Sequence, residues 1–299
     1  MFNGSILMNG VLIIDKPSGM TSHDVVARVR RTLKQKAVGH LGTLDPLATG
    51  VLPLVLGNMT RLAQFYLASE KGYEGVIRFG FATDTYDADG EPVGPDLDFT
   101  LNLAQARELA TRFIDEIEQM PPPFSAKKVK GIPAYKLARK KKEVKLEPIK
   151  VEVKQFEILD VDGPRARFTA RVASGTYMRS IAHEMGQLAG CGAHLQSLRR
   201  TKVAEFELKD AHTLEQLDEA ARGGEDVAEL LIHPRTLLPS IPAVTATDEV
   251  AAHIRHGRAV NLPELSRARE VKVFHRQREL IAISTRIAGT LFRPRIVFI

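Results

Sequence analysis

The chain has 299 residues, of which 44% are hydrophobic and 26% are charged, as in an average globular protein. This composition provides a core and excludes collagen-like, disordered and disulfide-scaffold proteins. The single cysteine, Cys191, excludes an internal disulfide and a multi-cysteine zinc site, and we expect it to be a small core residue. No apolar run approaches the roughly 18–20 residues that span a bilayer. The first ten residues lack the basic start of a secretory signal, which predicts a cytoplasmic protein.

Positive charge is concentrated in one segment. The chain carries 42 Lys and Arg against 36 Asp and Glu, a net charge of +6. Residues 127–150 contain ten basic and two acidic side chains, a net of +8, whereas the rest of the chain, with 32 basic and 34 acidic side chains, carries −2. Such a run is often only a solvated face. A compact basic arm on a nearly neutral body more often indicates a polyanionic partner.

The first elements surround an unusual loop. Gly10–Asp15 is an apolar, β-branched run that predicts a strand, and a turn follows at 16–19. Thr21 and Asp24 match a capping box, which predicts a helix start. The segment 39–50 contains three glycines and a proline, so we expect a shaped loop there rather than a regular element.

The later elements have clearer periodicity. In chain order we expect a helix over Met59–Ala68, a strand over Tyr73–Gly80, a helix over Leu103–Glu118, strands over Val151–Val161 and Arg165–Ser174, and a helix over Met178–Leu188. Ile232–Pro242 contains three prolines and is read as a linker. Beyond it, Ala243–Ile299 has short strand-like runs and one helical pattern over Asp248–His256. This tail predicts a small β-rich domain.

Several catalytic templates do not fit. The sequence has no G-x-x-x-x-G-K-[ST] phosphate loop and no G-x-G-x-x-G fingerprint. His183-Glu184 begins an H-E pair, but Gln187 stands where the second metal-binding His would be. Ser174 and Ser180 lack the flanking residues of a nucleophile elbow. We therefore expect neither a metal nor a nucleotide cofactor.

Asp45 is the candidate that remains, in the loop 39–50. Flanking glycines allow backbone to approach a ligand closely, and Pro46 holds Asp45 away from the α region. Apolar neighbours would desolvate the carboxylate, which then needs a partner or takes up a proton. A nearby Arg would keep it ionised, as a nucleophile or base requires. A lone Asp-Pro is otherwise an ordinary turn.

The loop reads GHLGTLDPLATGVLPL and stands in an ordered set of motifs. The others are DKPSGMTSHDVV (15–26), KGYEGVIRFG (71–80), TDTYDADG (83–90), QMPPPFSAKKVKGIPAYKLAR (119–139), SGTYMRSIAHEMG (174–186), GAHLQSLRRTKVAEF (192–206) and GTLFRPRIVF (289–298). Together they resemble the TruB family of pseudouridine synthases, which make pseudouridine-55 in the TΨC arm of tRNA.

The resemblance implies an α/β fold of the α+β type. The catalytic domain, residues 1–238, would contain a mixed, largely antiparallel sheet and a basic RNA-clasping insertion at about 120–150. Residues 243–299 would form a C-terminal PUA-like RNA-binding domain. The partner would be the TΨC stem-loop of tRNA, with no membrane association, and we expect a monomer. No cofactor is implied, and none is needed, because isomerisation oxidises nothing and imports no group.

The resemblance also assigns the site residues. Asp45 matches the catalytic aspartate, Tyr73 the tyrosine that stacks on the base and is implicated in proton removal, and Arg179 the arginine that pairs with the aspartate. Further positions match pocket, loop-stacking and supporting residues, namely Tyr177, Leu198, His40 and Lys16. The basic arm and a second basic cluster supply the expected RNA contacts, namely Lys127, Lys128, Lys130, Arg139, Lys140, Lys141, Lys142, Arg199 and Arg200.

Two other functions use the same residues. A non-catalytic tRNA-binding or folding protein would present the same basic surface, with Asp45 only shaping a loop. A glycosidase-like hydrolase would need a second carboxylate facing Asp45, for which Asp84, Asp87 and Asp89 are candidates. The synthase reading predicts an aspartate nucleophile acting on a uridine that has left its stack.

Overall fold

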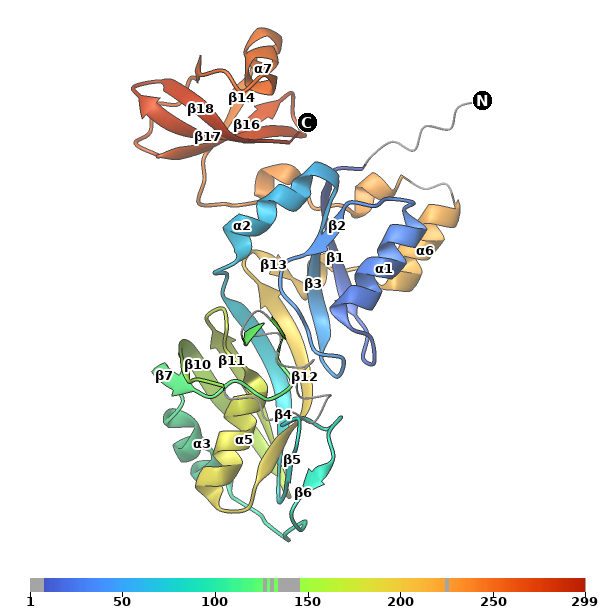
Figure 1. Cartoon of the computed structure of the whole chain (residues 1–299), viewed down its shortest axis with the longest axis vertical. Coiled ribbons are helices and arrows are strands. Elements are labelled where there is room, and N and C mark those ends of the chain that lie inside the picture. The colour runs from blue at the N-terminus through green and yellow to red at the C-terminus, as the bar shows by residue number, and fades with distance from the viewer. Residues whose placement is uncertain (1–7, 126–127, 130–131, 134–145, 224–225, 299) are drawn as a thin grey trace.

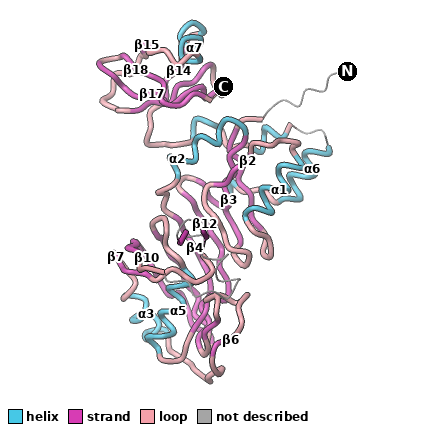
Figure 2. The backbone as a smooth tube through the Cα atoms, viewed as in Figure 1, coloured by secondary structure: helices cyan, strands magenta, loops and turns pink. Residues whose placement is uncertain are grey.

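The computed structural model of the chain describes residues 8–298 except 126–127, 130–131, 134–145 and 224–225, and within 126–145 it describes backbone only. The molecule is elongated, with a large sheet in the body of the chain and a smaller sheet at one end (Figure 1). Helices flank the strands in both parts (Figure 2). The expected mixed α/β fold with a β-rich C-terminal part is confirmed. None of the helices described is long and apolar enough to cross a membrane.

The large sheet has nine strands and carries the site. Its strands are β1 (Gly10–Lys16), β2 (Val38–His40), β3 (Thr49–Leu56), β4 (Lys71–Phe79), β7 (Asp115–Gln119), β10 (Ile149–Asp162), β11 (Arg165–Val172), β12 (Ala193–Val203) and β13 (Phe206–Glu207). The main path runs β1-β3-β12-β4-β11-β10-β7, while β2 pairs with β3 and β13 with β12. Every pairing is antiparallel except the short parallel contact between β12 and β3. The sheet is therefore mixed and largely antiparallel, as expected.

Helices and short turns complete the chain. The helices are α1 (Ser22–Thr32), α2 (Ala63–Tyr66), α3 (Leu103–Thr111), α5 (Met178–Ala189), α6 (Leu214–Gly223) and α7 (Asp248–Arg255), and the 3-10 turns are η1 (Gly57–Leu62), η2 (Leu208–Asp210), η3 (Val227–Leu230) and η4 (Pro234–Thr236). The predicted capping box of α1 is confirmed, because Thr21 and Asp24 cap each other's backbone N–H groups. The region 59–68 is helical as expected, although its first part is 3-10 rather than α.

The prediction of one long helix over Leu103–Glu118 is wrong in its second half. Helix α3 ends at Thr111, and Asp115–Gln119 forms strand β7 at the edge of the sheet, paired with β10. Asp115 has a φ of +73°, which an α-helix does not accommodate. The apolar residues after the turn occur at helical spacing, but pairing with the sheet overrides that local pattern.

The C-terminal part has its own sheet. Its strands are β14 (Ala243–Ala246), β15 (Val260–Asn261), β16 (Glu270–His275), β17 (Glu279–Ala288) and β18 (Leu291–Val297), in the order β14-β16-β17-β18-β15. Two small hairpins, β5 (Ala82–Thr83) with β6 (Pro92–Val93) and β8 (Lys128–Val129) with β9 (Ile132–Pro133), lie outside both sheets. One apolar cluster joins the two parts, because Phe274 and Ile283 pack with Leu62 and Tyr66.

Candidate active site

The loop that carries Asp45 runs from β2 to β3 and is fixed from several sides. The hydroxyl of Ser22, at the start of α1, accepts a hydrogen bond from the Leu44 N–H (2.8 Å) and donates one to the Leu44 carbonyl (3.1 Å). The Lys16 ammonium, which is completely buried, donates to the carbonyls of Pro17 (2.8 Å), Met20 (2.6 Å) and Pro46 (3.1 Å). The residues on both sides of Asp45 are thus held to the end of β1 and the start of α1.

Arg200 on β12 binds the backbone of the same loop. Its side chain is 0% exposed, and its guanidinium donates to the carbonyls of Gly42 (3.0 Å), Thr43 (3.3 Å) and Val51 (2.8 Å). The Tyr73 hydroxyl also lies close to this guanidinium. This arrangement corrects the expectation that Arg200 contacts RNA on the surface, since the side chain is fully buried and its guanidinium donates to three backbone carbonyls inside the protein.

Arg200 reaches the loop because β3 and β12 approach each other closely at Gly50. Gly50, at the start of β3, has a φ of +97° and pairs with Arg200 in the parallel bridge between the two strands. A Cβ atom at Gly50 would lie 2.2 Å from the Arg200 carbonyl oxygen. Only glycine fits at this point, so the glycine that ends the loop motif is required by packing.

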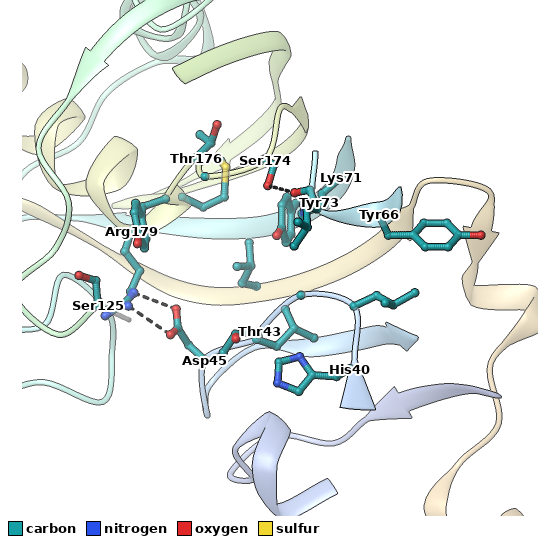
Figure 3. Close-up of a pocket in the computed structure, with 18 of the residues that line it drawn as sticks. His40, Thr43, Asp45, Tyr66, Lys71, Tyr73, Ser125, Ser174, Thr176 and Arg179 are labelled. Atoms are coloured by element: carbon teal, nitrogen blue, oxygen red, sulfur yellow. Dashed lines mark hydrogen bonds and ion pairs between the residues drawn. The ribbon is translucent and has the colours of Figure 1, made fainter. Parts of the chain in front are cut away.

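Asp45 forms an ion pair with Arg179 across the cavity floor. Arg179 Nε lies 2.9 Å from Asp45 Oδ2, without hydrogen-bond geometry, and Arg179 Nη2 donates to Asp45 Oδ1 at 3.1 Å (Figure 3). Arg179 is almost completely buried in the first turn of α5, while the Asp45 side chain remains 40% exposed toward the cavity. The pairing that the resemblance implied is therefore present in the structure.

Other groups hold the Arg179 guanidinium in place. Arg179 Nη1 lies 3.4 Å from the buried carboxylate of Asp87 and donates to the Thr85 carbonyl (3.1 Å), while Nη2 also donates to the Phe124 carbonyl (2.9 Å). Thr85 in turn donates its hydroxyl hydrogen to Asp87 Oδ1 (2.7 Å). Arg179 thus has little rotational freedom, which fixes the direction from which it contacts Asp45.

The start of α5 is held by an amide side chain. Gln119, the buried last residue of β7, accepts from the Tyr177 N–H (2.8 Å) and donates to the Tyr177 carbonyl (3.1 Å). Ser180 donates to the Met120 carbonyl at 2.6 Å. These bonds satisfy polar groups where the helix has no side-chain cap.

The environment perturbs the Asp45 carboxyl group. Burial raises the pKa of Asp45 above its ordinary value, the Arg179 guanidinium opposes that rise, and the nearby charge of Asp87 adds to it. Burial also raises the pKa of the Tyr177 hydroxyl and lowers the pKa of His40. Perturbed groups of this kind, gathered around one cavity, are typical of catalytic sites.

Asp45 opens into a cavity of about 320 Å³. Besides Asp45 and Arg179, four of the residues expected at the site line it, namely Tyr73, Tyr177, Leu198 and His40. In Figure 3 Asp45 and Arg179 lie at one end and Tyr66 at the other, with Tyr73 between them. Among the described residues that line this cavity, Asp45 is the one acidic side chain. The second carboxylate that a glycosidase-like hydrolase requires therefore does not line this cavity in the described part of the chain.

The remaining predicted residues lie elsewhere. Lys16 is not on the cavity wall but supports the loop beneath it. Arg199 points away from Arg200, is partly exposed, and pairs with Asp15 at 2.8 Å. Most of the basic arm lies outside the described residues, namely Lys127, Lys130, Arg139, Lys140, Lys141 and Lys142, and of Lys128 only the backbone, in β8, is described.

Some functional contacts were missed by sequence reasoning. Ser22 and Gln119 are ordinary polar residues in the sequence, and their motifs gave the only signal. Asp87 was considered as a second catalytic carboxylate, whereas the structure uses it to hold Arg179. Among the described residues, no group of three or more His, Cys, Asp or Glu side chains could hold a metal ion.

Comparison with known proteins agrees with this geometry. Residues 30–178 match the model of the TruB family pseudouridylate synthase N-terminal domain, and residues 179–239 match the tRNA pseudouridylate synthase B C-terminal domain. The tRNA pseudouridine synthase B of Solibacter usitatus is 49% identical over 294 residues, covering 97% of this chain and 100% of the relative. That of Aquifex aeolicus is 39% identical over 293 residues, with coverage of 97% and 100%.

Solved structures with lower sequence identity have the same fold. A chain from an H/ACA ribonucleoprotein bound to a substrate RNA containing 2′-deoxyuridine superposes with a TM-score of 0.71 at 25% identity, covering 97% of this chain and 85% of that one. A chain from the archaeal box H/ACA Nop10–Cbf5 complex gives 0.69 at 26% identity, with coverage of 98% and 87%. The chain belongs to the TruB family of pseudouridylate synthases and is a pseudouridine synthase.

Proposed function

We propose that this enzyme isomerises uridine-55 in the TΨC arm of tRNA, with Asp45 as the nucleophile. The close relatives are named tRNA pseudouridine synthase B, which supports tRNA as the substrate. The observation that carries the proposal is the Asp45 carboxylate, open to a cavity and held there by a buried guanidinium. A carboxylate fixed in this way is oriented toward a bound ligand before the ligand arrives.

The chemistry needs only groups that the chain supplies. Isomerisation breaks the bond between N1 and C1′, rotates the base and forms a bond between C5 and C1′. Attack by Asp45 on the base (C6) or on the sugar (C1′) would give a covalent intermediate, and the carboxylate is released when the new glycosidic bond is complete. The hydrogen on C5 leaves as a proton and N1 gains one, so the reaction is balanced without an oxidant or reductant.

The target base must leave its stack to reach Asp45, at a cost of a few kcal/mol. An aromatic ring that stacks on the base returns about 1–3 kcal/mol. Tyr73 is a candidate for this role, because it lines the cavity and is largely buried, which limits motion of the ring. Leu198 would contact the other parts of the base as an apolar wall.

The RNA around the target would be held by two basic regions. Residues 127–150 carry a net charge of +8. Residues 243–299, which we propose to be a PUA-like RNA-binding domain following a catalytic domain of residues 1–238, contain ten basic and five acidic side chains. Charge of this size attracts a polyanion without reading its sequence, and Arg199 stays a proposed contact on the body.

The test measures tritium release from a tRNA transcript labelled at uridine C5. Wild type is expected to release tritium from the TΨC loop, and Asp45→Asn is expected to release none while still binding the tRNA. Asp162→Asn, at an exposed position in the β10–β11 hairpin, is the matched control and should behave as wild type. Wild-type binding without release would refute this substrate, and free uracil as product would indicate hydrolysis.

A further inference from the structure

One cation on the cavity wall, Lys71, donates its hydrogen bond outside the loop that carries Asp45. Lys71 begins β4, two residues before Tyr73, so both side chains project to the same face of the strand about 7 Å apart. Both line the cavity, and Figure 3 shows Lys71 near Tyr73, at the side away from Asp45 and Arg179. A Cβ at Gly42 would lie 3.5 Å from Lys71 Cε, so the lysine stem reaches the loop that carries Asp45.

The ammonium group of Lys71 is only partly satisfied. It donates one hydrogen bond, to the Ser69 carbonyl at 2.7 Å, and no carboxylate among the described residues lies within ion-pair distance. The other cations at the site differ in this respect. Lys16 and Arg200 each donate to three backbone carbonyls, and Arg179 faces two carboxylates.

Electrostatics around Lys71 favour an anion. Burial, and secondarily the charge of Arg200, lower the pKa of Lys71 to about 8, so the group remains mainly protonated at neutral pH. A half-buried ammonium with spare donors is costly unless an opposite charge approaches it. Asp45 does not supply that charge, because its partner is Arg179.

We propose that Lys71 binds a phosphodiester group adjoining the flipped uridine and so positions the base over Asp45. The proposal rests on the proposed function, because it assumes that the base stacks on Tyr73. With the base there and the reacting bond facing Asp45, the sugar–phosphate backbone must leave the cavity along its walls. Among the residues whose side chains the structure describes, Lys71 is the cation beside Tyr73 with donors free to meet it. Lys71 is a binding and positioning residue and takes no part in bond making.

The experiment uses single-turnover tritium release with the whole chain in excess over labelled tRNA, at several enzyme and salt concentrations. Lys71→Met is expected to raise the half-saturating enzyme concentration roughly tenfold or more, with a much smaller change in the maximal rate constant. The slope of log affinity against log salt should fall by about 0.7–0.9, the loss of one phosphate contact. Lys71→Arg should keep the wild-type slope.

Two controls separate this contact from other effects. Lys209→Met removes one charge outside the cavity, where Lys209 is solvated and paired with Glu207, and should leave the half-saturating concentration unchanged. A tRNA with a neutral methylphosphonate on either side of the target uridine should abolish the difference between wild type and Lys71→Met at one of the two positions.

The outcomes distinguish this proposal from the proposed function. If Lys71→Met matches Lys209→Met, or if neither methylphosphonate removes its defect, the phosphate contact is refuted while wild-type tritium release still supports the synthase. If wild type releases no tritium from the TΨC loop, the proposed substrate fails first. A thermal melt of Lys71→Met that matches wild type shows that the defect is not unfolding.

Discussion

Replacement of Arg200 by Met tests whether a buried cation holds the catalytic loop. The substitution leaves the carbonyls of Gly42, Thr43 and Val51 without their donor. Each buried acceptor left unpaired costs about 1–3 kcal/mol, or roughly 3–9 kcal/mol for three. Met also avoids the desolvation of a guanidinium, which offsets several kcal/mol. We expect a net loss of about 2–4 kcal/mol in the free energy of unfolding.

Activity should fall further than stability alone explains. Gly42 and Thr43 lie three and two residues before Asp45, so loss of their anchor lets the carboxylate shift relative to Arg179. A displacement near 1 Å costs about 100-fold in rate. Urea unfolding gives the stability, and single-turnover tritium release under conditions where the variant is fully folded gives the rate.

Arg199→Met is the matched control. Arg199 is the preceding residue on β12, but it is partly exposed and pairs with Asp15 near the surface. Exposed pairs of this kind contribute about 0–1 kcal/mol, so its unfolding midpoint should stay near wild type. If Arg200→Met unfolds at the wild-type urea concentration and reacts at the wild-type rate, the anchoring argument is wrong.

Three further changes test the site and its supports. In the single-turnover pH profile, activity should fall as pH drops through the raised pKa of Asp45. Arg179→Gln should move this acid limb to higher pH, because the guanidinium lowers the pKa of Asp45. An acid limb that stays in place would contradict this. Gly50→Ala should lower the free energy of unfolding in urea by about 3 kcal/mol or more, because a Cβ there meets backbone atoms. Gly163→Ala, also at a positive φ but in open space, should lower it by about 1 kcal/mol. Equal losses would refute the packing argument. The carboxylates of Asp248 and Glu279 raise the pKa of His275. Wild type should therefore be more stable than His275→Gln at low pH and should lose that advantage as pH rises through the raised pKa. Thermal melts that differ by the same amount at every pH would contradict this.

Local signals in the sequence predicted the elements whose cause is local. The capping box at Thr21 predicted the start of α1, and alternation of apolar residues predicted β10 and β11. The helix over 103–118 failed because its second half is decided by a partner strand. Periodicity within 113–117 could not reveal that pairing.

The site was predictable only in part for a related reason. Asp45 stood out by its loop, but its pairing with Arg179 spans 134 residues and came from the family resemblance, not from spacing. Arg199 and Arg200 were read together as surface charge. Neighbouring residues of a strand point to opposite faces, and nothing in a basic cluster says which face is covered. The structure separates them into a surface ion pair and a buried anchor.

The use of carbonyl groups as partners explains how the site can be both rigid and positive. Lys16 and Arg200 are completely buried beside the catalytic loop, yet backbone oxygens, not carboxylates, satisfy their donors. Carbonyl dipoles hold a cation in place without cancelling its charge, so the loop gains fixed anchors while the region keeps a positive potential. Asp45 is the one acidic side chain among the described residues that line the cavity, and its direct partner is the Arg179 guanidinium. A nucleophile that must stay ionised and a substrate that brings phosphates can then occupy one cavity, because the same buried cations favour both.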